Sequence, residues 1–135
     1  MPKTFQIRTR EKRETTDVTA EVRKIVRAAG ARQGLCHVMV LHATAAIVVN
    51  ENDDPNIGID LLTALGGTIP EHGGWLHDRI DGNAQAHILA ATLGPSETIA
   101  IDGGDLVLGR WQGLMLVELD GPRERKIAVT VLPTG

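Results

Sequence analysis

Short runs of apolar residues, some alternating with polar residues and some continuous, recur along the 135-residue chain. Alternation with a period of two indicates half-buried strands, and short continuous aliphatic runs indicate buried ones. These patterns predict strands at residues 4–9, 35–41, 45–50, 98–101, 106–108, 113–119 and 126–132. The sequence Asp102-Gly103-Gly104-Asp105 is typical of a tight turn, so the two strands beside it are predicted to form a hairpin.

Three segments are predicted to be helical. The first begins at a cap formed by Thr16 or Asp17 and runs to Ala29, with apolar residues on one face. The second begins at Asp54-Pro55 and ends at the glycines of positions 66 and 67, and the third spans residues 83–93. Residues 68–82 show no periodicity and are predicted to form a long loop, which in a compact domain is usually functional or mobile.

These elements predict an α+β fold, mostly antiparallel sheet with about three helices, in a single domain over residues 1–135. An aromatic content of 2% and a net charge of −3 argue against a nucleic-acid partner. The chain shows no signal peptide and no apolar run near the roughly 20 residues of a membrane span, so we expect a cytoplasmic protein with no membrane partner. Cys36, the only cysteine, lies in an apolar run and is predicted to be a buried, inert thiol.

Histidine, acidic and amide side chains concentrate between His42 and His87. His37 and His42 are five residues apart, so in one continuous strand they face opposite sides and at most one can reach a given site. His42 stands at the strand end, where a side chain can reach a cleft. Glu51 follows the next apolar run and is predicted to lie beside His42 if the two runs form a hairpin. A carboxylate near a histidine can orient it, share a metal ion with it or act as a general base.

A second group of polar residues surrounds the start of the third helix. Asp81 or Asn83 can cap this helix, and His87 lies one turn beyond Asn83 on the same face. His77 comes from the preceding loop and can converge with His87 at the helix N-terminus. Unpaired amides make such a terminus favourable for an anion. The spacing is therefore compatible with a phosphate site, a metal site or a helix cap.

The basic residues offer two further candidates. Arg110 and Gln112 belong to the glycine-flanked segment 109–113, which is either a turn between strands or a polar edge of a site. A basic cluster of Arg123, Arg125 and Lys126 follows a Gly-Pro turn and is either a solvated strand end or a phosphate contact. The chain has no serine-centred nucleophile motif, which disfavours nucleophilic catalysis.

Taken together, these segments resemble the YjbQ-like family, also described as secondary thiamine-phosphate synthase-like proteins. The resemblance covers nearly the whole chain and depends on the order and spacing of several short motifs. The motifs are His42-Ala43-Thr44-Ala45-Ala46, Asn50-Glu51-Asn52 with Asp54-Pro55, His77-Asp78, Asp81-Gly82-Asn83-Ala84, Ala86-His87, Leu108-Gly109 with Trp111-Gln112-Gly113, and Asp120-Gly121-Pro122-Arg123.

The resemblance implies a compact α+β domain that forms a homotrimer, with a pocket near the subunit boundaries. It also implies a weak thiamine-phosphate synthase activity, which joins hydroxymethylpyrimidine diphosphate to a thiazole phosphate and releases pyrophosphate. The polar site residues that carry over are His42, Glu51, His77, Asp81, Asn83 and His87.

Three positions depart from the family pattern. Ala43 replaces a hydroxyl residue, Arg110 replaces a threonine, and Leu89 stands where a basic residue commonly occurs. The Leu89 change removes a potential phosphate contact, whereas Arg110 adds one. The resemblance therefore predicts the fold of this protein but does not by itself determine its substrate.

The first hypothesis is thus an enzyme that acts on a small phosphorylated ligand. Its catalytic residues are predicted to be His42, Glu51 and His87. Its substrate-binding residues are predicted to be Asn83, Arg110, Gln112 and Arg123. A divalent metal, Mg²⁺ or Zn²⁺, is predicted at His42, Glu51, His77, Asp81 and His87. The alternatives are a metal-dependent hydrolase with Glu51 as base, and a non-catalytic trimer that binds a small anionic ligand.

Overall fold

The computed structural model describes residues 2–134, and it has two antiparallel sheets and three α-helices. The strands are β1 (Lys3–Arg8), β2 (Glu14–Asp17), β3 (Gln33–Val40), β4 (Ala45–Glu51), β5 (Ser96–Asp102), β6 (Asp105–Leu106), β7 (Gln112–Glu118) and β8 (Glu124–Pro133). The helices are α1 (Thr19–Ala29), α2 (Pro55–Thr68), the short 3-10 helix η1 (Leu76–Arg79) and α3 (Ala84–Leu93). The predicted α+β class with three α-helices is therefore confirmed.

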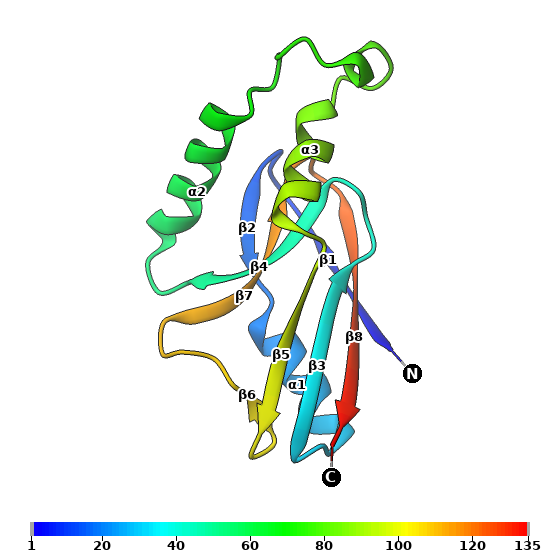
Figure 1. Ribbon diagram of the computed structural model, residues 1–135, viewed down its shortest axis with the longest axis vertical. Helices are drawn as coiled ribbons and strands as arrows, with labels where there is room; N and C mark the ends of the chain where they lie inside the picture. The colour runs from blue at the N-terminus through cyan, green and yellow to red at the C-terminus, as the bar shows by residue number, and fades with distance from the viewer. Residues whose placement is uncertain (1, 135) are drawn as a thin grey trace.

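The larger sheet has the strand order β1-β8-β3-β5-β6, and the smaller sheet has the order β2-β7-β4 (Figure 1). Every pair in both sheets is antiparallel. The β5–β6 hairpin forms as predicted, with Asp102 opposite Asp105. Its two turn glycines have positive φ angles of 60° and 79°, which side chains rarely adopt.

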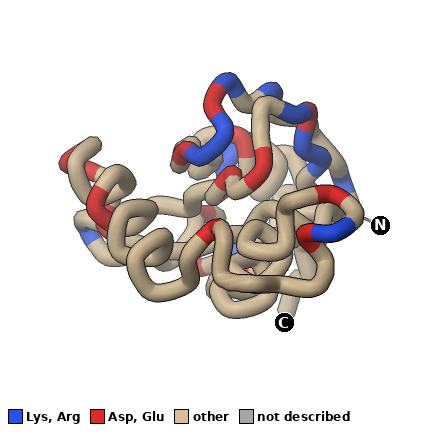
Figure 2. Tube along the Cα trace, turned by 90° about the horizontal axis from the view of Figure 1, so that it is seen from above, with Lys and Arg blue, Asp and Glu red and all other residues tan. Residues whose placement is uncertain are grey.

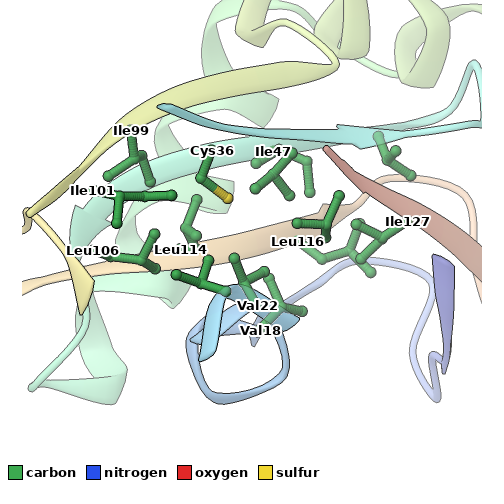
Figure 3. Close-up of a cluster of buried hydrophobic side chains, with 14 of the residues drawn as sticks. Val18, Val22, Cys36, Ile47, Ile99, Ile101, Leu106, Leu114, Leu116 and Ile127 are labelled. Carbon is green, nitrogen blue, oxygen red and sulfur yellow. The ribbon is translucent and has the colours of Figure 1, made fainter. Parts of the chain in front are cut away.

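The main hydrophobic core fills the space between the two sheets, and α1 closes one side of it (Figure 3). Val18, Val22 and Val26, at the start of α1 and along it, pack against Ile47 of β4 and Leu116 of β7. Their spacing of four residues places these valines on one helical face, as the sequence pattern predicted. Cys36 is fully buried in this core, and burial raises the pKa of its thiol to about 11, so it is inert as expected.

The opposite face of β4 and β7 carries a second apolar cluster, against which α3 packs. Ala86, Leu89 and Ala90 of α3 meet Ala46 and Val117 of the strands. Small side chains on both sides let the helix approach the sheet closely. Leu89, one of the three departures from the family pattern, is buried here and is therefore a core residue.

Helix α2 lies at the left edge of the molecule in Figure 1. It buries fewer of its residues than α3 does. Its only buried residue is Gly58, where a Cβ atom would come within 2.2 Å of the Thr15 hydroxyl oxygen. The glycine therefore allows α2 to touch β2.

Charged residues of both signs lie interspersed along the trace (Figure 2). Within residues 2–134, no helix has the length and apolar content that crossing a membrane requires.

Several local predictions were wrong. Residues 14–17 form β2, so α1 begins at Thr19, although the Asp17 carboxylate still accepts a hydrogen bond from the Thr19 amide at 2.8 Å. Helix α2 continues through its two glycines to Thr68, and the predicted loop contains η1. The expected strand 106–108 shortens to Asp105–Leu106. Most importantly, β3 and β4 do not form a hairpin, because they belong to different sheets.

Candidate functional site

Two histidines from different elements meet beside the N-terminus of α3. His77 belongs to η1 and His87 to α3, and their ring centroids are 4.9 Å apart in an edge-on arrangement. Asp81 lies one turn beyond His77, with a carboxylate oxygen 3.7 Å from the His77 Nε2 atom. The structure therefore brings together three of the predicted site residues, as the sequence suggested for His77 and His87.

The helix cap of α3 comes from a residue that the sequence interpretation did not select. The Asp78 carboxylate accepts a hydrogen bond from the Ala84 amide at 3.0 Å. Asn83 occupies the N-cap position but makes no side-chain cap hydrogen bond, and Asp81 is exposed. Asn83 is therefore the N-cap residue, as one of the two sequence alternatives had it, but Asp78 supplies the side-chain hydrogen bond, and the Asn83 and Asp81 side chains make other contacts.

Asp120 connects the start of α3 to the turn before β8. Its Oδ2 atom accepts hydrogen bonds from Asn83 Nδ2 and Arg123 Nη2, each at 3.0 Å. Its backbone carbonyl accepts a third bond from Arg123 Nε at 2.8 Å. Burial opposes ionisation of the Asp120 carboxyl, but the hydrogen bonds from Asn83 and Arg123 outweigh it and hold its pKa below the ordinary value. Asn83 and Arg123, predicted as separate binding residues, thus share one carboxylate.

A buried ion pair between Arg125 and Glu118 contacts the backbone of Asp120. Arg125 and Glu118 have side-chain exposures of 2% and 0%, and the Arg125 Nε atom donates to Glu118 Oε1 at 2.9 Å. Thr9 donates to the same carboxylate at 2.7 Å, and the Asp120 amide donates to its other oxygen at 3.0 Å. Arg125 also donates to the Thr44 hydroxyl oxygen at 2.8 Å. These bonds compensate both buried charges and hold the β7–β8 turn in place.

The sequence interpretation considered one member of this network, Arg125, as part of a solvated strand end or a phosphate contact, and the structure instead buries it against Glu118. A signal was present, because Glu118 and Arg125 interrupt otherwise apolar or alternating strand patterns. A charged residue is almost never fully buried unless it is paired. That Glu118 and Arg125 are each other's partners becomes evident only when β7 and β8 are placed in the fold.

His42 lies next to this network and has a structural contact. Its Nε2 atom accepts a hydrogen bond from the Lys126 amide at 2.9 Å, which requires an unprotonated Nε2. Burial and the nearby Arg125 guanidinium lower the pKa of His42 below its ordinary value of 6.5. His42 is therefore held as the neutral ring, with only its Nδ1–H left to donate.

This arrangement predicts a pH dependence of stability. Because the pKa of His42 is lower in the folded than in the unfolded chain, its contribution is complete above pH 6.5 and is lost as the pH falls below that value. We expect the free energy of unfolding of His42→Gln, measured in urea between pH 5 and 7.5, to fall less steeply on acidification than that of the wild type. His72→Gln, at an exposed loop position, is the control and should keep the wild-type slope. Equal slopes for all three proteins would contradict this assignment.

Glu51 does not lie beside His42, contrary to the sequence interpretation. It ends β4 opposite Gln112, whereas the His42 loop precedes the other end of β4 near Glu118. A strand of seven residues is roughly 20 Å long. The difference arises because β4 pairs with β7 in the smaller sheet instead of returning along β3.

A second polar group therefore surrounds Glu51. The Gln112 side-chain oxygen accepts a hydrogen bond from the Gly109 amide at 2.7 Å, and the Arg110 guanidinium stacks 4.8 Å from the Trp111 ring centroid. Asn52 donates to the Asp17 carboxylate at 2.5 Å. Of the predicted residues, Glu51, Arg110 and Gln112 lie in this group, which we call the Glu51 end. The others lie at the α3 end, namely His42, His77, Asp81, Asn83, His87 and Arg123.

The five predicted metal ligands do not fit a metal centre within one chain. His42, Glu51 and the group around His77 are held in separate places, and no three His, Cys, Asp or Glu side chains among residues 2–134 are arranged to hold an ion. The His77 Nε2 atom is buried without a hydrogen-bond partner among residues 2–134, and the Asp81 carboxylate lies 3.7 Å from it. The single chain thus offers an imidazole pair and an arginine, a donor set suited to anionic oxygen atoms.

Comparison with known proteins identifies the relatives of this chain. The model of a family described as "UPF0047 protein YjbQ-like" matches residues 3–134. A UPF0047 protein of Methanothermobacter thermautotrophicus is 38% identical over 125 residues, covering 93% of this chain and 87% of the relative. The UPF0047 protein YugU of Bacillus subtilis is 35% identical over 135 residues, covering 98% and 99% of the two chains.

Solved structures agree with the sequence comparison. The crystal structure of a YbjQ-like protein of unknown function from Sulfolobus solfataricus has a TM-score of 0.95 at 38% identity, covering 99% of this chain and 97% of the other. That of a YjbQ/UPF0047 family protein from Clostridium acetobutylicum has a TM-score of 0.92 at 38% identity, covering 96% and 98%. The chain therefore belongs to the YjbQ-like UPF0047 family.

Proposed function

We propose that the protein is an enzyme acting on small phosphorylated molecules, and that it joins hydroxymethylpyrimidine diphosphate to a thiazole phosphate to form thiamine phosphate. The activity is the one that the family resemblance implies. The observation that carries the proposal is the pairing of His77 with His87 beside the N-terminus of α3, whose N-cap residue Asn83 shares the Asp120 carboxylate with Arg123. These groups can donate hydrogen bonds to phosphate oxygens.

The proposed reaction requires stabilisation of a leaving diphosphate. The thiazole nitrogen forms a bond to the methylene carbon of the pyrimidine substrate, while the bond from that carbon to the diphosphate oxygen breaks and its electron pair leaves with pyrophosphate. Negative charge grows on the diphosphate during this step. Hydrogen bonds from His77, His87 and Arg123 are stronger to the developing charge than to the ground state, so they lower the barrier. Mg²⁺ enters this proposal as the counterion of the diphosphate substrate.

We also propose that the protein works as a homotrimer, with Glu51, Arg110 and Gln112 of one chain completing the site at the α3 end of the next. The two groups lie at opposite ends of β4, and head-to-tail contacts in a closed ring would place such ends side by side. The poorly covered apolar surface supports this proposal. Ile59 of α2 is 62% exposed, and Leu76 and Ile80 around η1 are 73% and 78% exposed.

The activity is tested with the purified protein, both substrates and Mg²⁺, by measuring thiamine phosphate formation. We expect His87→Ala to lower the rate by roughly 100-fold, because it removes a donor to the leaving group. The matched control is His72→Ala, which removes an exposed loop histidine outside both groups and should retain the wild-type rate.

Two results would overturn the proposed function. If wild type and His87→Ala form thiamine phosphate equally, the histidine pair does not act on the leaving group. If wild type binds pyrophosphate but forms no product, the protein is a binder of small anions and not a synthase. The activity assay separates these two cases, and calorimetric titration with pyrophosphate and Mg²⁺ measures the binding that the second case requires.

A further inference from the structure

We propose that Asp120 is a positioning residue, which holds the Arg123 guanidinium in place for the anionic part of the ligand and ties it to the first turn of α3. This inference rests on the proposed function, since it concerns the same site. Asp120 is not one of the residues that sequence reasoning selected for binding or catalysis. Its role follows from the contacts that surround it.

The first argument concerns Arg123. Its side chain is 53% exposed, and the hydrogen bonds that hold it among the described residues go to Asp120, through Nε to the backbone carbonyl and through Nη2 to Oδ2. An exposed arginine normally loses much rotational freedom when it binds an anion. The two bonds to Asp120 restrict that freedom before the ligand arrives. The donors of Arg123 that Asp120 does not use remain available to a phosphate group.

The second argument concerns how Asp120 itself is fixed. Its side chain is only 18% exposed, and its amide donates to the fully buried Glu118 carboxylate at 3.0 Å. Its Oδ2 atom also accepts the Asn83 bond at the start of α3. The carboxylate is thus held from the sheet on one side and from the helix on the other. Through it, the position of Arg123 is coupled to the helix that carries His87.

The Asp120 carboxylate has two opposite effects on anion affinity. It repels the ligand by its negative charge, and it favours binding by orienting Arg123. Arg123 and Asn83 bind the Asp120 carboxylate directly, and the positive charge of the nearby Arg125 acts on it as well. These groups offset much of its field, whereas the carboxylate supplies one of the two hydrogen bonds that orient Arg123, the bond from Nη2 to Oδ2. We therefore expect the loss of Asp120 to weaken anion binding, although it removes a negative charge.

The test is a double-mutant cycle read by calorimetric titration with pyrophosphate and Mg²⁺. We expect Asp120→Ala and Arg123→Ala each to raise the pyrophosphate Kd by about tenfold, and the double variant to bind no more weakly than Arg123→Ala. Asp102→Ala, at an exposed hairpin aspartate, is the matched control and should keep the wild-type Kd. If Asp120→Ala does not fold, Asp120→Asn replaces it in the same cycle, with a smaller loss that again requires Arg123.

Three other results of this titration would each overturn the inference, and each has a different cause. Additive losses in the double variant would show that Asp120 acts independently of Arg123, as a purely structural residue would. An unchanged or tighter Kd in Asp120→Ala, with a weaker one in Arg123→Ala, would show that charge repulsion dominates and would leave the proposed function intact. Absence of pyrophosphate binding by the wild type would remove the proposed function and this inference together.

Discussion

Glu118→Ala is expected to lower the free energy of unfolding by about 3–5 kcal/mol, the largest stability effect that we predict for this protein. The substitution leaves the Arg125 guanidinium buried without its counter-charge, since Arg125 is only 2% exposed. It also removes the acceptor for the Thr9 hydroxyl and the Asp120 amide. Urea unfolding at a fixed protein concentration measures the change.

The cause of this loss is tested by removing both charges. The double variant Glu118→Leu/Arg125→Met fills similar space without burying a charge, so we expect it to be clearly more stable than Glu118→Ala. Glu124→Ala, at an exposed position of β8, is the control and should change stability by less than about 0.5 kcal/mol. A double variant no more stable than Glu118→Ala would show that hydrogen bonding, and not the unpaired charge, causes the loss.

Mixing two inactive variants is expected to restore activity. If each site takes Glu51 from one chain and His87 from the next, Glu51→Gln and His87→Ala inactivate different halves of it. Random reassembly of equal amounts gives mixed trimers in which one site of three has both intact halves. We therefore expect about one-quarter of the wild-type thiamine phosphate formation after the two variants are unfolded and refolded together.

The matched control places both substitutions on the same half. His77 and His87 meet within one chain, so a mixture of His77→Ala and His87→Ala contains no intact α3 half and should stay inactive. Complementation by this control pair would contradict the proposed division of the site. A wild type that light scattering shows to be monomeric would exclude the trimer itself.

The strands and helices could largely be predicted from the sequence because their patterns are local. The valines of α1 repeat at helical spacing, and the Asp102–Asp105 turn and its flanking strands are contiguous. The prediction failed for β2, whose four residues carry no apolar alternation and are held by pairing with β7. It also failed at the glycines of α2, because the helix continues through them to Thr68.

The candidate site was predictable only in part, for a related reason. His77 and His87 are close in sequence and meet beside one helix, so local spacing was enough to place them together. The proximity of His42 and Glu51 depended on a hairpin that does not form. Asp120 was missed as an organising residue because only one of its partners, Arg123, is local, three residues along the chain. The other partner, Asn83, reaches it only because α3 packs on the smaller sheet.

The sequence by itself determined the α+β class, the helical face of α1, the burial of Cys36 and the possible meeting of His77 with His87, since each was predicted from a pattern or spacing within a short segment. The tertiary structure alone decided which strands share a sheet, and hence that β4 carries Glu51 away from His42. It also decided the pairing of Glu118 with Arg125 and the hydrogen bond from Lys126 to His42 across 84 positions. The periodicity of apolar residues predicts which face of a strand or helix is buried. Which other strand or side chain that face contacts is decided by burial and hydrogen bonding over the whole chain.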